Sequence, residues 1–281
     1  MTDDRTSGYR TSIGTADSAS ITVLGQNLAE DLMGNVGLGE LAFWFVAQRR
    51  PSPGELRLFE TCLVALADHG FTPSVVAARL TLTGAPEAMQ GAIAAGLLGG
   101  GSRFLGVTED CGRFLAETIA AHPHESDDWD AMARAAVQRR HAAGALIPGL
   151  GHPLHRAGDP RTPVILRIAE EQGLLGGHLQ LFQAIGRVHP EIIGRRLPLN
   201  GAGAVGAALA DIGFPAEIMR GFALLARTAG LLGHLAEELR QPVGDAIYHD
   251  VSRAVDYQAP AKPASHRPTA AGDERGSTDT A

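Results

Sequence analysis

The sequence predicts an all-α fold. Ala, Leu and Gly dominate the chain while aromatic residues make up only 5% of it, which favours close-packed helices over a sheet rich in Val, Ile and Tyr. Apolar residues recur at helical spacing along most of the chain. The pattern contains no alternation of strands with helices and no repeat of fixed period.

Turn and cap residues mark where the helices begin. A polar segment over residues 1–20, which is expected to be flexible, precedes a short extended piece at 21–24. Ser52-Pro-Gly-Glu55 is a capping box with Pro at the first helical position, and the helix behind it is apolar at Leu56, Phe59, Leu63 and Leu66. Further helices are expected over 73–82, 86–98 and 215–239, and on both sides of a loop between residues 143 and 162.

Composition limits the class of protein. A net charge of −7 without a basic stripe argues against a nucleic-acid binder. Cys62 and Cys111 lie in helical patterns as small core residues, so we expect no disulfide. No signal peptide or membrane span is visible, and a cytoplasmic location is expected. Residues 258–281 lack large apolar side chains and are expected to form a disordered tail.

The loop 149–161 is the most informative segment, because it combines Gly and Pro with two histidines, an aspartate and two arginines. His152 titrates near neutral pH, and Arg161 has the planar fork that binds carboxylates. These residues suit an anionic substrate whose oxygen exchanges a proton. The alternative is a loop histidine that only satisfies a local hydrogen bond. A metal site at His152 and His155 is not expected, because no third ligand stands at a supporting spacing.

Two further constellations have both a functional and a structural interpretation. His69 ends a helix before Gly70, where it would bind a ligand or cap the helix terminus. Arg227 and His234 share one face of a long helix in apolar surroundings. Arg227 there needs a partner, either a ligand carboxylate or an acid in a salt bridge.

Residues 201–206 match the pattern G-x-G-x-x-G, which is found in dinucleotide-binding folds. Such a fold requires a strand before the glycines and another strand after the helix. The preceding segment is short and contains Pro198, and helices follow. We therefore do not expect a nicotinamide cofactor.

Taken in order, these segments resemble the citrate synthase family. The resemblance rests on the segment ending at Gly70, the loop 149–161 and the segment 226–234, and it covers roughly residues 21–250. Segments 30–34, 96–104 and 199–203 are most similar to citryl-CoA lyases, including the C-terminal part of ATP-citrate lyase.

The resemblance implies a helical fold with a cleft between a large and a small domain, in a homodimer. The large domain would comprise 21–100 and 209–257, and the small domain 101–208. The substrates would be a coenzyme A thioester and an oxaloacetate- or citrate-like carboxylate, with no permanently bound cofactor. The implied site residues are His152 and His69 as catalytic groups, Arg161 and Arg227 on carboxylates, and Gly149, Leu150, Gly151 and Pro153 near coenzyme A.

Two positions depart from the family pattern. Phe104 stands where synthases place a histidine, which favours a lyase because Phe donates no hydrogen bond. Ala202 replaces the catalytic aspartate, and losing a general base typically lowers a rate by about 10²–10⁴-fold. The family's C-terminal arginine has no clear match in 241–248.

Three functions follow as hypotheses. The first is a citryl-CoA lyase-like enzyme that cleaves or forms the C–C bond between acetyl-CoA and oxaloacetate. The second is a catalytically impaired protein that binds coenzyme A or a carboxylate. The third, a citrate synthase-type acyltransferase, is disfavoured by Phe104 and Ala202.

Overall fold

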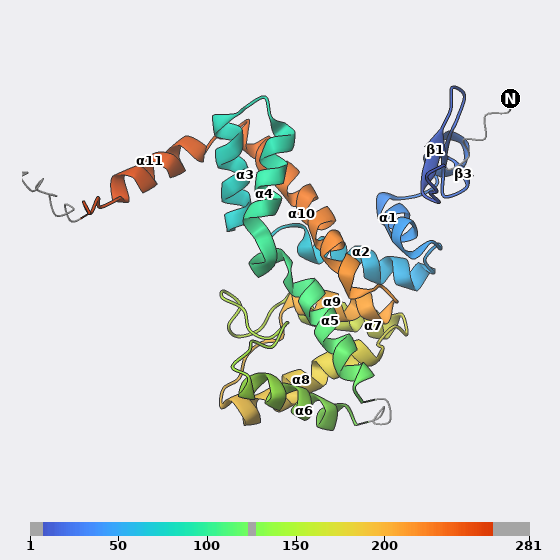
Figure 1. Ribbon diagram of the computed structural model, residues 1–281, viewed down its shortest axis with the longest axis vertical. Coiled ribbons are helices and arrows are strands. Elements are labelled where there is room, and N and C mark those ends of the chain that lie inside the picture. The colour runs from blue at the N-terminus through green and yellow to red at the C-terminus, as the bar shows by residue number, and fades with distance from the viewer. Residues whose placement is uncertain (1–7, 123–127, 261–281) are drawn as a thin grey trace, which may run out of the picture.

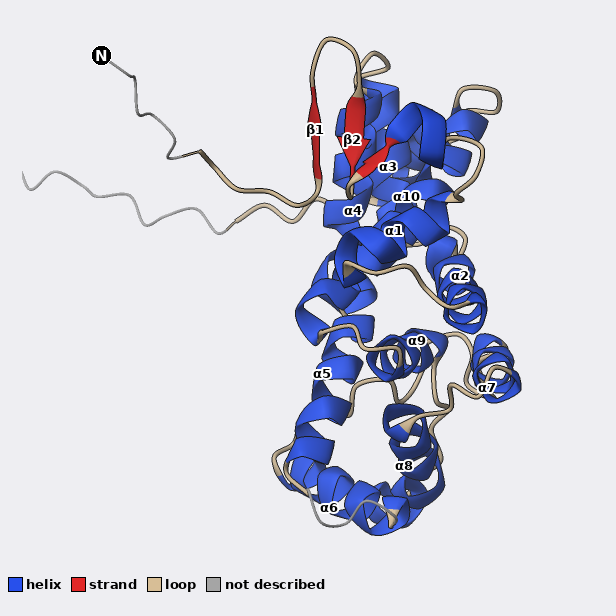
Figure 2. Ribbon diagram, turned by 90° about the vertical axis from the view of Figure 1, so that its right-hand side faces the viewer, coloured by secondary structure: helices blue, strands red, loops and turns tan. Residues whose placement is uncertain are grey.

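A computed structural model describes residues 8–122 and 128–260, and it is almost entirely helical (Figures 1 and 2). The fold class expected from the sequence is therefore confirmed. Most of the expected disordered tail, residues 261–281, lies outside the described residues, as do residues 1–7. None of the described helices combines the length and hydropathy that crossing a bilayer requires.

A small antiparallel sheet precedes the helices. It orders β1 (Gly14–Ala16), β2 (Ile21–Val23) and β3 (Gln26–Asn27) side by side, and a short π-helix, η1 (Leu28–Leu32), follows. β2 is the extended piece expected at 21–24. β1 lies within the segment expected to be flexible and was missed, because its three residues are all exposed and show no apolar alternation.

The helices fill the remainder of the chain. They are α1 (Leu38–Ala47), α2 (Pro53–Ala67), α3 (Pro73–Gly84), α4 (Met89–Leu105), α5 (Val107–Ala120), α6 (Trp129–Ala142), α7 (Arg161–Glu171), α8 (Gly177–Ile193), α9 (Gly201–Asp211), α10 (Ala216–Glu238) and α11 (Gly244–Ala254).

The predicted helix starts are mostly confirmed. Ser52 and Glu55 form the reciprocal capping box of α2, and Thr72 and Pro215 are the N-caps of α3 and α10. The start predicted at Pro86 is wrong, because α4 begins at Met89 after a turn. α4 also continues beyond the predicted end, through a kink at Gly101, whose φ of +50° is left-handed.

Two apolar cores hold the helices together. The main core joins α1, α2, α5 to α9 and the first half of α10, and Phe59, Leu115 and Phe182 are fully buried in it. A satellite core joins α3, α4 and the second half of α10; its buried members are Val75, Ala78, Leu82, Ala92, Leu231 and Leu235. α10 is the one helix common to both cores. The two-domain division drawn from the resemblance stays a prediction.

α10 approaches the end of α2 very closely at Gly230. A Cβ at this position would collide with the carbonyl oxygen of Ala67, a backbone atom that cannot turn aside. Because Asp68 and His69 follow Ala67 directly, the small size of Gly230 sets where those side chains lie. Gly233, one turn further along the same helix, faces open space.

Replacing Gly230 with Ala is expected to lower the free energy of unfolding by about 1–3 kcal/mol, because α10 and α2 must separate. Gly233→Ala is the matched control and should raise it by about 0.5–1 kcal/mol through helix propensity. Urea denaturation of both variants measures the difference. If both substitutions changed the free energy of unfolding equally, the close contact between α10 and the end of α2 would be contradicted.

Candidate functional site

Three histidines from two distant segments meet between α2 and the loop before α7. His69 Nε2 and His155 Nε2 lie 3.1 Å apart, and the ring centres of His152 and His155 are 4.5 Å apart. One ring nitrogen from each of the three histidines lies within 4.8 Å of the chosen nitrogens of the other two. We call His69, His152 and His155 the histidine cluster. The sequence analysis placed two of them in one site but gave His155 no role.

The tautomer of His152 is set by the backbone. Its Nδ1 accepts the N–H groups of Leu154 and His155 at 3.1 and 3.0 Å. Since Nδ1 presents a lone pair, the neutral ring carries its hydrogen on Nε2. Burial and then the charge of His155 lower the pKa of His152, so the neutral form is favoured near neutral pH. His152 is thereby prepared to donate a hydrogen bond to a substrate oxygen.

Arg161 is held by Asp159 in a two-point ion pair. Arg161 Nε donates to Asp159 Oδ1 at 3.0 Å and NH2 donates to Oδ2 at 2.8 Å, while NH1 donates to the carbonyl of Ala65. The Gly201 N–H also donates to Asp159 Oδ2, at 2.7 Å. Burial raises the pKa of Asp159, but these hydrogen bonds outweigh it and hold the pKa far below its ordinary value. Of the five N–H groups of a guanidinium, two therefore remain for a ligand.

The start of the loop is fixed against the segment before α9. Gly151 N–H donates to the Pro198 carbonyl, Asn200 N–H donates to the Gly149 carbonyl, and the Asn200 side chain donates to the Gly151 carbonyl. Gly149 has φ +80°, and a Cβ on Gly203 would lie 2.5 Å from its Cα. The loop and α9 thus meet backbone to backbone.

This contact explains the G-x-G-x-x-G pattern. Gly201 abuts the Arg161 guanidinium, Gly203 abuts Gly149, and Gly206 abuts the Thr108 carbonyl of α5. α9 starts directly at its N-cap Asn200, and the residue before it, Leu199, forms only an isolated bridge with Leu150 and not a strand. The glycines allow helix packing, and the expectation that they do not bind a dinucleotide fits this geometry.

Arg227 reaches the same region from α10. Its side chain is buried, its NH2 donates to the Leu66 carbonyl at 3.2 Å, and no partner of Nε lies within the described residues. Burial lowers the pKa of Arg227, and Asp68 opposes that shift. A buried guanidinium without a direct carboxylate partner is suited to a ligand anion.

His234, expected beside Arg227, instead belongs to a buried polar network. It bridges Asp68 at 2.9 Å and Arg79 at 2.9 Å, so Nε2 carries its hydrogen toward Asp68. Arg79 is fully buried and pairs with Glu237 and Glu238. Sequence reasoning missed this network, because its members lie on α3 and α10, far apart along the chain. The network fixes Asp68, the residue before His69.

No described carboxylate close to the cluster is left free. Asp159 is saturated by Arg161 and Gly201, and Asp211 caps α8 through the N–H groups of His178 and Leu179. Asp68 accepts from His234 and from the Gly70 N–H. Neither Asp159 nor Asp211 therefore replaces the carboxylate absent at Ala202. The guanidinium of Arg227 and the two remaining N–H groups of Arg161 are the donors left for a ligand carboxylate.

The two altered family positions lie outside the histidine cluster. Ala202, on the first turn of α9, is half-buried against the main core. Phe104, near the end of α4, is 44% exposed. Neither side chain titrates.

The histidine cluster does not fit a metal ion well. A third histidine, His69, comes from a segment far from the loop, so the argument from sequence spacing alone did not include it. A metal needs the Nε2 lone pair of His152, yet the two backbone N–H groups at Nδ1 place the hydrogen on Nε2. Arg161 also lies close enough to lower the pKa of His152. The geometry favours proton handling at an anion.

A shallow hollow of about 670 Å³ lies behind the loop. Ala157, Gly158 and Asp159 line one side of it, and α8 and the segment 196–199 line the other. Arg196 is exposed there and forms no ion pair among the described residues. The hollow adjoins the loop that carries His152.

The protein is thus helical, and its fold brings the histidine cluster close to Arg161. The model of the citrate synthase C-terminal domain matches residues 11–248, so the chain belongs to the citrate synthase family. A citryl-CoA lyase from Hydrogenobacter thermophilus is 28% identical, with a TM-score of 0.80 over 91% of this chain and 96% of that one.

Other relatives are longer. A citrate synthase of a Synechocystis strain is 25% identical over 202 residues, which are 70% of this chain and 48% of the relative, so the chain spans about half of its length. An ATP citrate lyase from Methanothrix soehngenii, solved with citrate and coenzyme A, has a TM-score of 0.72 over 90% of this chain and 42% of that one. At 20% identity it supports the fold.

Replacing Asp159 with Asn should lower the free energy of unfolding by about 3–5 kcal/mol, because Arg161 loses a buried partner. The folded-state pKa of Asp159 is lowered, so its stabilising effect is complete above the ordinary carboxyl pKa of about 3.9 and is lost as the pH falls through the folded value. The difference between variant and wild type should therefore be constant at neutral pH and shrink below about pH 4.

Asp130→Asn is the control for this prediction, because the Asp130–Arg187 pair is half-exposed on both sides. Its effect should stay below about 1 kcal/mol. Denaturant unfolding at a series of pH values measures both variants. A difference for Asp159→Asn that grows in acid would refute the assigned ion pair.

Proposed function

We propose that this protein is a citryl-CoA lyase-like enzyme that cleaves, or forms, the bond between acetyl-CoA and oxaloacetate. The observation that carries the proposal is the meeting of the histidine cluster with Arg161 and Arg227, without a free carboxylate between them. Citryl-CoA carries two free carboxylates, a hydroxyl group and a thioester, so it needs arginines at the carboxylates and a hydrogen-bond donor at the hydroxyl oxygen. The similarity to a citryl-CoA lyase across nearly the whole length of both chains supports this choice.

The chemistry follows from the proposed roles. A proton leaves the tertiary hydroxyl, the adjacent C–C bond breaks, and its electron pair forms the thioester enolate, which takes a proton at carbon. Arg161 and Arg227 bind the carboxylates, and His69 holds the citryl end. His152 donates from Nε2 to the hydroxyl oxygen and stabilises its developing charge. Closure of the two predicted domains over the site would exclude water from the enolate.

We place coenzyme A along Gly149, Leu150, Gly151 and Pro153. The hollow of about 670 Å³ is lined by the later part of the same loop, Ala157 to Asp159, and by residues 196–199, to which Gly151 is hydrogen-bonded. It would take part of coenzyme A, and Arg196 in its lining suits a phosphate. Coenzyme A then acts as part of the substrate, and no permanently bound cofactor is required.

Ala202 favours a second candidate, a protein that binds citryl-CoA or its parts without turning it over. Its methyl group exchanges no proton with the acetyl carbon. The two candidate functions share the same ligands, but only the first includes cleavage of citryl-CoA. Phe104 and Ala202 together argue against the third, a citrate synthase.

The proposal is tested with purified full-length protein and synthetic citryl-CoA, with oxaloacetate followed by an NADH-dependent reductase. His152→Ala should lower kcat by about 10²–10⁴-fold, because the donor at the hydroxyl oxygen is lost. His141→Ala, an exposed position on α6, should leave the rate unchanged. Absence of turnover together with retained coenzyme A binding would reject the enzyme and support the second candidate.

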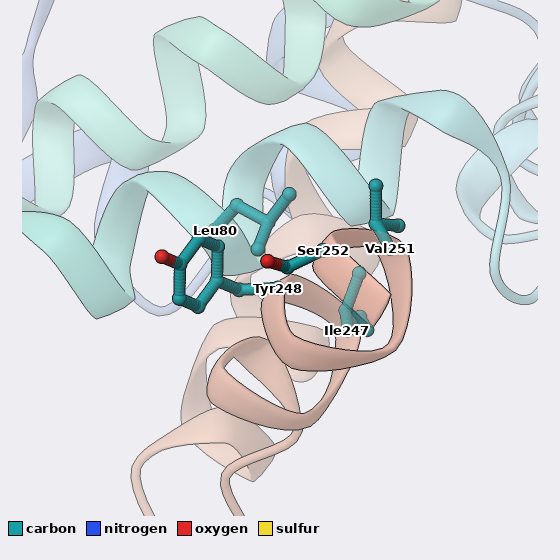
Figure 3. Close-up of a pocket in the computed structure, with 5 residues that line it drawn as sticks. All are labelled: Leu80, Ile247, Tyr248, Val251 and Ser252. Carbon is teal, nitrogen blue, oxygen red and sulfur yellow. The ribbon is translucent and has the colours of Figure 1, made fainter. Parts of the chain in front are cut away.

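We also propose a homodimer that covers α11. This helix extends from the body beside α3 (Figure 1), and Tyr248 and Val251 on it are 61% and 60% exposed. Together with Leu80, Ile247 and Ser252 they line an apolar hollow of about 350 Å³ (Figure 3). Exposed apolar side chains on an amphipathic helix are stabilised when another surface buries them. In a symmetric dimer a second copy buries them with the same apolar surface.

Val251→Asp should shift the protein from dimer to monomer, because a charge would be buried in the apolar contact. Ala246→Asp is the control, because Ala246 is exposed and lies on the other side of the same helix, and this variant should remain dimeric. Light scattering coupled to size-exclusion chromatography gives the masses. A monomeric wild type, or a dimer unaffected by Val251→Asp, would contradict this interface.

A further inference from the structure

The histidine cluster contains one residue to which neither the sequence nor the proposed chemistry assigns a role, His155. Its ring is half-buried and contacts both other rings of the cluster. His155 Nε2 lies 3.1 Å from His69 Nε2. At this distance one nitrogen donates its hydrogen and the other presents a lone pair. The lone pair in this contact becomes available to a substrate once a ligand on His69 breaks the hydrogen bond between the two rings.

We propose that His155 carries the proton in the lyase reaction and so replaces the carboxylate that Ala202 lacks. This inference rests on the proposed function and extends it. A hydroxyl oxygen that accepts from His152 Nε2–H must give its own proton to a nearby lone pair. The ring centre of His155 is 4.5 Å from that of His152, whereas the ring centre of His69 is 5.2 Å away. His155 is thus the nearer acceptor within the cluster.

The step balances with this one residue. When His69 turns its Nε2–H from His155 to the citryl end, the Nε2 lone pair of His155 is free. His155 Nε2 then takes the hydroxyl proton as the C–C bond breaks and the thioester enolate forms. The resulting imidazolium then gives the same proton to the enolate carbon and completes the methyl group of acetyl-CoA. His155 returns to its neutral form, and no further reactant is consumed.

Other titratable groups near the site are unsuited to this task. Asp159 and Asp68 are engaged in hydrogen bonds, and His152 Nδ1 is occupied by backbone N–H groups. Cys111 lies behind Gly149, but it is fully buried, and burial raises the pKa of its thiol. Since Asn200 at the start of α9 is bonded to Gly151, the loop that carries His155 is fixed beside the helix turn that holds Ala202.

The test is cleavage of citryl-CoA by full-length His155→Asn. The expected kcat is lower by about 10²–10⁴-fold with KM changed less than about threefold, because Asn carries no proton but keeps the polar volume. His141→Asn is the surface control and should match the wild type. The thermal unfolding midpoint of each variant shows whether it folds. If His155→Asn fails to fold, His155→Gln is subjected to the same assay and the same criteria.

A second substitution tests the role more directly. Ala202→Asp in the His155→Asn background should raise kcat at least about tenfold above that of His155→Asn alone, because it supplies another proton carrier. The same substitution in the wild type should change kcat much less. Recovery of this kind is not expected if His155 only supports the loop.

The outcomes separate the two proposals. If the wild type cleaves citryl-CoA and folded His155→Asn retains kcat within about threefold, or loses activity through KM alone, the role of His155 is wrong and the proposed function stands. A folded double variant without recovered kcat also rejects the role. If the wild type does not cleave citryl-CoA, the proposed function fails and this inference fails with it. Activity that appears only in Ala202→Asp would show that the site binds substrate but that His155 does not move the proton.

Discussion

The contact between the loop 149–161 and the start of α9 determines the site. Gly149 and Gly203 meet backbone to backbone, and the Asp159 carboxylate joins Arg161 to the Gly201 N–H. Because these contacts consist of backbone and a buried ion pair, the loop has little freedom to shift. The positions of His152, His155 and Arg161 all follow from it.

The second constraint comes from the other side of the site. Gly230 allows α10 to lie against the end of α2, and the Arg79 network holds Asp68. His69 is thereby brought to the loop histidines, and Arg227 reaches the same space from α10. The site thus combines segments that both cores support. Asp159 and Asp68 both stay ionised, and Arg161 offsets the charge of Asp159 in a direct ion pair. Arg227 has no direct carboxylate partner among the described residues, which leaves its guanidinium for a ligand.

The sequence alone predicts those structural features that depend on neighbouring residues, such as helix caps. Helix starts at Ser52, Thr72 and Pro215 follow from caps and prolines, and the G-x-G-x-x-G pattern was correctly separated from a dinucleotide fold. The expected residues His69, His152, Arg161 and Arg227 lie in one region. The roles assigned to them stay predictions until substrate turnover is measured.

Other features depend on contacts between distant segments. His155 gained a partner only when the chain brought His69 to it, across 86 positions. Arg79 looked like an ordinary helix residue, although it is fully buried between acids of α10. The commitment of Asp159 to Arg161 was equally invisible, since spacing does not show which partner a carboxylate chooses. The exposed strand β1 carried no periodic signal.

The most direct measurement of the central claim is a titration of the full chain with oxaloacetate, followed by nuclear magnetic resonance of the histidine rings. A carboxylate site built around the histidine cluster predicts that the signals of His69, His152 and His155 shift together and saturate at one ligand per chain. The signals of the exposed His141 and His249 should stay in place. Saturable binding that leaves the three cluster signals unchanged, or no binding at all, would contradict the account.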